Sequence, residues 1–333
     1  MRLLVLGGTV FVSYTVAAEA VRRGHEVVCA ARGTSGSVPD GARLVEVDRD
    51  RPDGLDPLAG EQFDAVVDVA TVSYPWVDQA LKALAERARH WTFVSTINVY
   101  ADEDTPGQRP DAPLVEPLTR HATRDDMRTE DGVRLYGGIK VASENAVREA
   151  MGEHAFVVRP GLISGPGDVL DRFGYWPARF FRGGRALVPD APDQPMQYID
   201  VRDLAGWIVD AAEQDRSGTY DGIGPSRPLP DLLRDIAEAV GVPVEFVPAT
   251  SEQLVAAKVN GWAGPRSLPF WMPSGYRGMR ARDAQLSIDA GMPVRPLADA
   301  VAGALENEHA LGLDRERKAG LTLDEEAEVL SGL

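Results

Sequence analysis

Short apolar runs alternate with amphipathic segments along the first third of the chain. Five of these runs are too short and too continuously apolar for amphipathic helices, and they are typical of strands buried on both faces. The predicted strands cover residues 3–6, 27–31, 44–47, 65–69 and 91–95. Apolar positions spaced by three and four predict helices over residues 12–23, 75–88 and 134–149. This alternation predicts an α/β fold with a doubly wound parallel sheet of the Rossmann type.

The first predicted strand ends in a glycine turn that leads directly into a helix. Gly7 and Gly8 allow a sharp turn and a close approach to a ligand, and the free N–H groups of the following helix favour a phosphate. Only Gly7 is in register with the dinucleotide fingerprint G-x-x-G-x-x-G, because the other two positions hold Val10 and Ser13. The turn is either a phosphate-binding loop or merely a connection between strand and helix.

The end of the second predicted strand bears on the choice of cofactor. NAD-binding units place an acidic residue there for the ribose hydroxyls, whereas NADP-binding units place an Arg nearby for the 2′-phosphate. This chain has Ala31 and Arg32 at that point. The pair favours NADP, and the alternative is that Arg32 is a solvated cation in a loop.

The carboxyl ends of the strands form the crevice where a doubly wound sheet binds its ligands. Thr96 follows the strand over residues 91–95 and is therefore placed at this crevice. Tyr136 and Lys140 follow on a predicted helix, where a spacing of four puts the phenol and the ammonium on one face. A Tyr with a pKa near ~10 acts as an acid or base at neutral pH only if its anion is favoured, and a neighbouring ammonium lowers the pKa by roughly 1–3 units.

One long segment and two aromatic stretches differ in composition from the predicted strands and helices. Residues 101–132 contain four prolines among nine acidic residues, and they are predicted to form a long loop that is either a lid or a solvated insertion. Aromatic residues gather at 173–181 and again at 262–276, where they either close a core or line an apolar pocket, and both stretches would flank one cleft.

The rest of the chain is predicted to build a smaller, mixed substrate-binding region. Helices are predicted over 201–213, 228–240 and 296–307, with a strand over 244–247 and a capping box from Thr322 to Glu325 for a last short helix. We expect a dinucleotide-binding core over 1–165. Residues 166–333 are expected to form the substrate-binding region and the tail, with 196–224 returning to the core sheet.

Composition and charge mainly exclude classes of partner and of site. Asp and Glu number 51 against 35 Lys and Arg, a formal net charge of −16, so neither nucleic acid nor a membrane surface is an expected partner. The single Cys29 excludes an internal disulfide, no apolar run is long enough to cross a membrane, and Met1 opens directly into a strand. We therefore expect a cytoplasmic protein. Its five histidines are scattered, which predicts no metal site.

Several motifs in a fixed order resemble the extended short-chain dehydrogenase/reductase family, also described as the NAD-dependent epimerase/dehydratase family. The motifs are GGT at 7–9, STINVY at 95–100, YGGIK at 136–140, RPGLISGPGD at 159–168 and YIDVRDLA at 198–205, with Asp48 after the third strand.

The resemblance implies a role for each matching residue. Thr96 would hydrogen-bond the substrate oxygen, Tyr136 would donate or accept the proton, and Lys140 would lower the tyrosine pKa and hold the nicotinamide ribose. Asp48 would bind the adenine amino group. The cofactor-binding residues would be Gly7, Gly8, Thr9, Phe11, Val12, Arg32, Asp48, Ala70, Pro160 and Ile163. The resemblance also implies a homodimer through the helices at about 75–88 and 134–149.

Three departures from the family pattern narrow the function. Val10 and Ser13 replace glycines in the loop, and a side chain at the position of Val10 points toward the cofactor pyrophosphate. Sugar-nucleotide dehydratases carry an Asp-Glu pair after the catalytic Thr, where this chain has Ile97 and Asn98. Related epimerases clasp the substrate diphosphate with an Arg at the position of Met196. Dehydration by the mechanism of those dehydratases would therefore lack its acid and base, and Met196 disfavours a nucleotide-sugar substrate.

The sequence thus predicts an NADP(H)-dependent oxidoreductase, with NAD as the alternative cofactor. It would move hydride to or from a carbonyl or carbinol carbon of a small, fairly apolar or weakly anionic metabolite. The rival enzyme is an NAD-dependent sugar or sugar-nucleotide epimerase, which would hold NAD⁺ tightly and make no net redox change. The rival outside enzymes is a cofactor-sensing regulator of the same fold, which would need neither Tyr136 nor Lys140.

Overall fold

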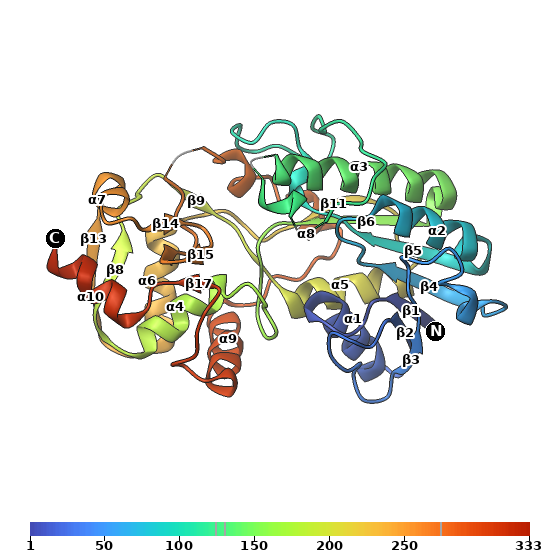
Figure 1. Cartoon of the computed structure of the whole chain (residues 1–333), viewed down its shortest axis with the longest axis horizontal. Coiled ribbons are helices and arrows are strands. Elements are labelled where there is room, and N and C mark those ends of the chain that lie inside the picture. The colour runs from blue at the N-terminus through green and yellow to red at the C-terminus, as the bar shows by residue number, and fades with distance from the viewer. Residues whose placement is uncertain (124, 130, 274) are drawn as a thin grey trace.

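The computed structural model describes residues 1–123, 125–129, 131–273 and 275–333, and it is organised around one large parallel sheet (Figure 1). The strand order is β11-β6-β5-β4-β1-β2-β3, and every neighbouring pair is parallel. The strands are β1 (Arg2–Leu6), β2 (Glu26–Ala31), β3 (Arg43–Glu46), β4 (Phe63–Asp68), β5 (Ala88–Val94), β6 (Ala155–Pro160) and β11 (Gly218–Gly222). The predicted doubly wound Rossmann-type sheet is confirmed.

The two faces of this sheet carry different helices. They are α1 (Phe11–Arg22) and α5 (Val201–Glu213) on one face, and α2 (Tyr74–Leu84) and α3 (Gly132–Met151) on the other. Successive side chains of a strand point to opposite faces, so Leu3 and Val5 enter one apolar cluster while Leu4 enters the other. Both faces of β1 are therefore buried, which explains its continuously apolar sequence.

The strand order reverses at β1, which pairs with β2 on one side and with β4 on the other. The carboxyl ends of β1 and β4 thus form the switch point at which such sheets bind ligands. Gly7 and Gly8 follow β1 with φ of +135° and +103°, a region that L side chains rarely adopt. A Cβ on Gly8 would collide with the Cys29 side chain of β2. Glycine is required here by close packing as well as by the turn.

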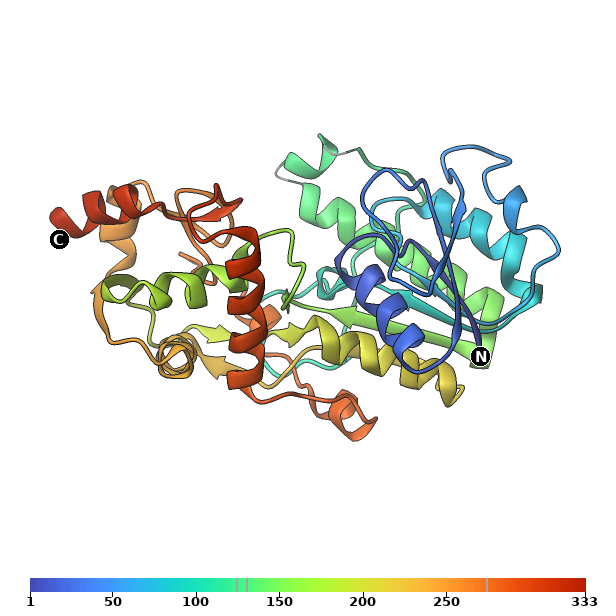
Figure 2. The same cartoon turned by 90° about the horizontal axis from the view of Figure 1, so that it is seen from below.

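A smaller part of the molecule lies beside the sheet (Figure 2). Its longer elements are α4 (Arg172–Phe181), β8 (Gly184–Pro189), α6 (Leu229–Val240), β13 (Val244–Ala249), α9 (Leu297–Leu311) and α10 (Leu323–Ser331), with β8 parallel to β13. The remaining short elements are β7 (Ile163–Ser164), β9 (Pro195–Met196), β10 (Ile199–Asp200), β12 (Arg227–Pro228), α7 (Ser251–Ala256), β14 (Asn260–Gly261), β15 (Gly264–Pro265), β16 (Ser267–Leu268), α8 (Gln285–Asp289) and β17 (Ala319–Gly320). Of these, β10 contacts α5 and α8 contacts β11 on the side of the large sheet. The predicted capping box of α10 is confirmed, since Thr322 and Glu325 bond each other's backbone N–H.

The aromatic stretch at 173–181 closes the core of this smaller part. Phe173, Tyr175, Trp176 and Phe180 are almost fully buried, whereas Phe181 is partly exposed. The core alternative for this stretch is therefore the correct one. The expected division of the chain near residue 165 stays a prediction.

The long connection over 101–132 is mostly irregular and follows the outer side of α3. Val115 donates to the Val99 carbonyl, Leu118 donates to the Gly138 carbonyl, and Gly107 donates to Ala281. Residues 124 and 130 of this predicted lid, and residue 274 of the second aromatic stretch, lie outside the described residues. Among the described helices, none is both long and apolar enough to cross a membrane.

Substitution of Gly8 by Ala should destabilise the fold through its contact with Cys29. We expect Gly8→Ala to lower the free energy of unfolding by about 2–4 kcal/mol, the sum of backbone strain and overpacking. Gly24→Ala is the matched control, because Gly24 also has a positive φ, +83°, but has open space around its Cβ position. It should cost only about 1–2 kcal/mol. Urea unfolding measures both, and equal losses would contradict the steric role of Cys29.

Candidate active site

A cavity of about 680 Å³ lies between the carboxyl edge of the sheet and the smaller part. The sheet side contributes the first turn of α1, residues 94–98 at the end of β5, Tyr136 and Lys140 of α3, and residues 160–163 at the end of β6. The smaller part contributes Arg172, Trp262, Met272, Tyr276 and Arg280. Residues from three of the predicted motifs and from the first turn of α1 therefore line one cavity.

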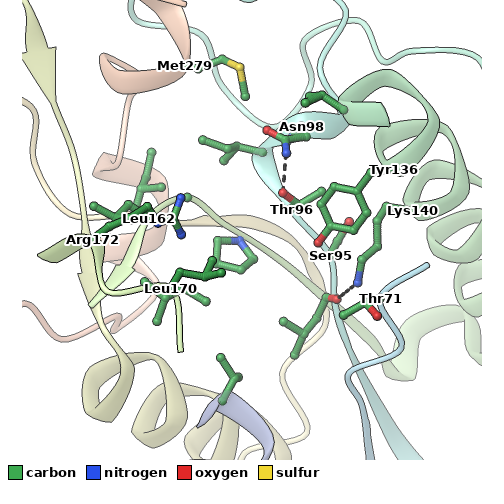
Figure 3. A pocket seen from close by; sticks show the side chains of 18 of the residues that line it. Thr71, Ser95, Thr96, Asn98, Tyr136, Lys140, Leu162, Leu170, Arg172 and Met279 are labelled. Carbon is green, nitrogen blue, oxygen red and sulfur yellow. Dashed lines mark hydrogen bonds between the residues drawn. The ribbon is translucent and has the colours of Figure 1, made fainter. Parts of the chain in front are cut away.

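Thr96 and Tyr136 lie next to each other on the sheet side of this cavity (Figure 3). Thr96 caps the short turn η3 (Ile97–Val99), where its hydroxyl accepts a hydrogen bond from the Asn98 N–H at 3.2 Å. Burial raises the pKa of Tyr136 to about 12, and the Thr96 hydroxyl offsets part of this increase. At neutral pH the phenol is therefore protonated, and it can donate a proton or hydrogen bond to an oxygen in the cavity.

Lys140 is held below this pair and is almost fully buried. Its ammonium donates to the carbonyls of Ala70 at 2.5 Å and Val94 at 2.6 Å, at the ends of β4 and β5. Burial lowers the pKa of Lys140 to about 7, against the opposing charges of Asp68 and Glu144. The predicted lowering of the Tyr136 pKa by this ammonium is not found, because the ammonium is directed to the two carbonyls and burial dominates the phenol.

The first turn of α1 offers backbone donors to an anionic ligand. Its N-cap residue, Val10, provides no side-chain cap, and the first turn contains no acidic residue. Ser13 is buried and donates its hydroxyl to the Val10 carbonyl at 2.8 Å, so it packs within the loop. Val10 is 37% exposed and lines the cavity, as expected of a side chain at that glycine position. The uncapped N–H groups and the positive-φ glycines fit a dinucleotide phosphate.

A second cavity of about 180 Å³ adjoins the first, since Val69 and Thr71 line both. The predicted cofactor-binding residues divide between the two. Phe11, Val12, Pro160 and Ile163 line the larger cavity, and Gly7, Thr9, Arg32, Asp48 and Ala70 line the smaller one. Gly8 lines neither, because it packs against Cys29. The two cavities together follow the carboxyl ends of β1, β2, β4 and β5.

Two cationic residues are found among the described residues that line the smaller cavity, and they differ in burial and in ion pairing. Arg49 is buried, forms paired hydrogen bonds with Asp68 at 3.0 and 2.9 Å, and donates to the Trp76 carbonyl. The side chain of Arg32 is 54% exposed, and its nearest carboxylate, that of Asp50, is 3.7 Å away. Arg32 is therefore the cation available to a ligand, whereas Arg49 supports the cavity wall.

The sequence predicted only part of the lining that the smaller part contributes to the cavity. Trp262, Met272 and Tyr276 of the second aromatic stretch line it, as expected, but the first stretch lies in the core. Arg172 and Arg280 also line it, and neither was a candidate. The available signal was their position beside the two aromatic stretches. The predicted lid is placed elsewhere, since no described residue of 101–132 lines either cavity, and its closing role stays a prediction.

Comparison with known proteins places this chain in a family. The model of the NAD dependent epimerase/dehydratase family matches residues 3–223. The chain belongs to this family. It is thus an NAD(P)-dependent enzyme of the extended short-chain dehydrogenase/reductase type, and the resemblance seen in the sequence is confirmed.

The individual proteins that resemble this chain share less than a third of its residues in the aligned regions. A curated relative, 2′-dehydrokanamycin reductase of Streptomyces kanamyceticus, is 28% identical over 264 residues, which are 76% of this chain and 70% of that protein. WbmH of Bordetella bronchiseptica, solved with NAD⁺, aligns with a TM-score of 0.64 and 19% identity over 92% of this chain and 98% of its own. RMD of Pseudomonas aeruginosa, solved with NADPH, gives 0.57 and 17% over 92% and 99%. At these identities the two structures show a shared fold.

The buried ammonium of Lys140 predicts a pH dependence of stability. Its pKa falls from 10.5 to about 7 on folding, so between those values the unfolded chain binds more protons than the folded one. The free energy of unfolding should therefore rise with pH, by up to ~1.4 kcal/mol per unit between about pH 7 and 10. Lys140→Met should lack this rise.

The matched control is Lys82→Met, since Lys82 is exposed on α2 and pairs with Asp78. Urea unfolding at a series of pH values between about 6 and 10 measures all three proteins. Equal slopes for the wild type and Lys140→Met would show that Lys140 keeps an ordinary pKa in the folded protein.

Proposed function

We propose that this enzyme is an NADP(H)-dependent reductase that transfers hydride to the carbonyl carbon of a small molecule, and that it also runs in reverse from the carbinol. The observation that carries the proposal is the pair of hydroxyl groups, Thr96 and Tyr136, beside the end of β5 in a cavity that adjoins the glycine loop. The curated relative named as a reductase supports the reaction class.

The state of Tyr136 favours the reductive direction. With a pKa of about 12, its phenol holds its proton at neutral pH and can donate it to a carbonyl oxygen. Thr96 donates a second hydrogen bond to the same oxygen, which stabilises the charge that develops there. When bound, the nicotinamide supplies or accepts the hydride. Lys140 is a positioning residue, because its two hydrogen bonds fix α3 against the strand ends.

The cofactor assignment rests on the smaller cavity. The free N–H groups of the first turn of α1 suit the pyrophosphate, and Arg32, Thr34 and Ser35 line the smaller cavity together with Asp48. A guanidinium and two hydroxyl groups suit a ribose 2′-phosphate, and Ala31 adds no negative charge. These residues support NADP over NAD.

The rival functions lack support from specific residues. Met196, at the position of the diphosphate-binding Arg of related epimerases, is buried in the core of the smaller part. Ile97 is a buried apolar residue next to Thr96. A regulator would need no hydroxyl pair in the cavity, whereas Thr96 and Tyr136 are both present there. A subunit contact through α2 and α3, which pack together on one face of the sheet, remains part of the proposal.

Removal of the Tyr136 hydroxyl should affect chemistry and leave binding intact. We expect Tyr136→Phe to lower the turnover of 4-nitrobenzaldehyde, used as a neutral probe aldehyde, by about 10²–10⁴. Cofactor affinity and thermal melting should stay at wild-type values. Tyr14→Phe, on the exposed side of α1, is the control. Near-wild-type turnover in Tyr136→Phe would remove this residue from the mechanism.

The cofactor preference should depend on Arg32. We expect NADPH to bind at least about tenfold tighter than NADH, because one charge-assisted hydrogen bond contributes ~1.5–3 kcal/mol. Arg32→Ala should remove most of this preference, and added salt should reduce it. Arg43→Ala is the control, since Arg43 is half exposed, pairs with Glu61 and lines neither cavity. Fluorescence titration measures both cofactors, and tighter NADH binding by the wild type would exclude the NADP assignment.

A further inference from the structure

The described lining of the larger cavity carries an unusual balance of charge. Lys140, Arg172 and Arg280 line it, and no Asp or Glu does so among the residues described. The whole chain has a formal net charge of −16, so the balance in the cavity is opposite to that of the molecule. A concave, partly buried site lined by one sign of charge favours a ligand of the other sign.

The two arginines are brought together by one aromatic ring. Arg172 is the first residue of α4, and Arg280 ends the short turn η6 (Gly278–Arg280). Their guanidinium carbons lie 5.0 and 4.7 Å from the centre of the Trp262 indole ring. Such stacking holds a guanidinium in place and leaves its N–H edge free for an anion.

Trp262 is itself held rigidly. Its backbone has φ of +66°, in the left-handed region that disfavours a bulky side chain, and its N–H donates to the Trp271 carbonyl at 2.9 Å. Strain of this kind persists only where the surroundings fix the residue, and it gathers at binding sites. The two guanidinium groups therefore rest on a preorganised support.

Neither guanidinium forms an ion pair within the described part of the chain. The Nε atoms of Arg172 and Arg280 are buried without a hydrogen-bond partner, and neither side chain has a carboxylate at ion-pair distance there. Arg280 makes one long contact, 3.4 Å, with the Tyr276 carbonyl. The charge of Asp168 opposes the lowering of the Arg172 pKa by burial. Burial also raises the pKa of the Asp168 carboxyl, which disfavours its charged form. Burying unpaired cations is costly, and an anion in the cavity offsets this cost.

We propose that Arg172 and Arg280, supported by Trp262, bind a compact anionic group of the substrate, a carboxylate or a phosphate. This assignment rests on the proposed function, in which Thr96 and Tyr136 bind the reacting oxygen. Figure 3 shows Arg172 on the opposite side of the cavity from Tyr136. The lining also includes the apolar side chains of Leu162, Ile223 and Met279. The substrate class is thus a carbonyl compound with an apolar body and an anion at its far end.

Binding of probes that cannot be reduced tests this assignment separately from the reaction. Four compounds with a common ring are titrated into the protein and followed by ligand-observed NMR: benzoate, phenyl phosphate, benzamide and benzylammonium. We expect benzoate or phenyl phosphate to bind at least about tenfold tighter than benzamide, and benzylammonium to bind weakest. The tighter of the two anions identifies the group as carboxylate or phosphate.

Two variants locate the site of the preference. Arg172→Gln and Arg280→Gln should each reduce the ratio of anion to benzamide affinity by about tenfold. Arg185→Gln removes the same charge from an exposed side chain of β8 and should leave the ratio unchanged. Equal binding of both anions and benzamide by the wild type would overturn the proposal, whether or not the variants fold.

Turnover separates this proposal from the function on which it rests. Loss of the anion preference with reduction of 4-nitrobenzaldehyde intact would overturn only the anion site. An intact preference in a protein that reduces no carbonyl probe with either cofactor would overturn only the proposed reaction.

Discussion

The buried ammonium of Lys140 is the constraint on which the rest of the site depends. It hydrogen-bonds the carbonyls of Ala70 and Val94, and so ties α3 to the ends of the two strands that border the cavity. Such an ammonium is tolerated only beside opposite charge. Asp68 and Glu144 supply that charge, and each is buried and held by its own arginine, Asp68 by Arg49 and Glu144 by Arg159. Because Tyr136 lies one turn before Lys140 on the same helix, this network of buried charges also fixes the phenol beside Thr96.

The glycine loop shows how a family motif can change its residues and keep its physical function. Gly8 cannot change, since β2 leaves no room for a Cβ, and the turn at Gly7 requires a positive φ. Ser13 replaces a glycine at a position where its small side chain is buried and satisfied by the Val10 carbonyl. Neither departure caps the first turn of α1, so the N–H groups remain available to a phosphate. The loop is therefore atypical in sequence but still suited to an anion.

The sheet was predictable where burial on both faces leaves a continuous apolar run, as in β1, β2 and β4. The ends of the helices were harder to predict. The helix predicted to residue 88 ends at Leu84, and β5 begins at Ala88. The prediction ran too far because alanines continue the apolar spacing into the turn between them. The return of residues 196–224 to the core sheet was predicted, but the strand β11 within it was not located, since its sequence, GTYDG, forms a strand only by pairing with β6. The helix α4 was missed because Pro177 and a nearly all-round buried surface hide its periodicity. Arg172 and Arg280 could not be paired from sequence, because only the tertiary fold brings both to the indole of Trp262.

The proposed anion site and the hydroxyl pair occupy different sides of the larger cavity, since Figure 3 shows Arg172 across the cavity from Tyr136. A guanidinium close to a phenol would stabilise the phenolate and lower its pKa. Among the described residues, the pKa of Tyr136 responds to burial and to the Thr96 hydroxyl, and to neither Arg172 nor Arg280. The arginines are not among the causes that shift this pKa, and burial keeps the phenol protonated. An anion held by them leaves Tyr136 protonated, so binding at one end preserves the acid that a carbonyl oxygen needs at the other.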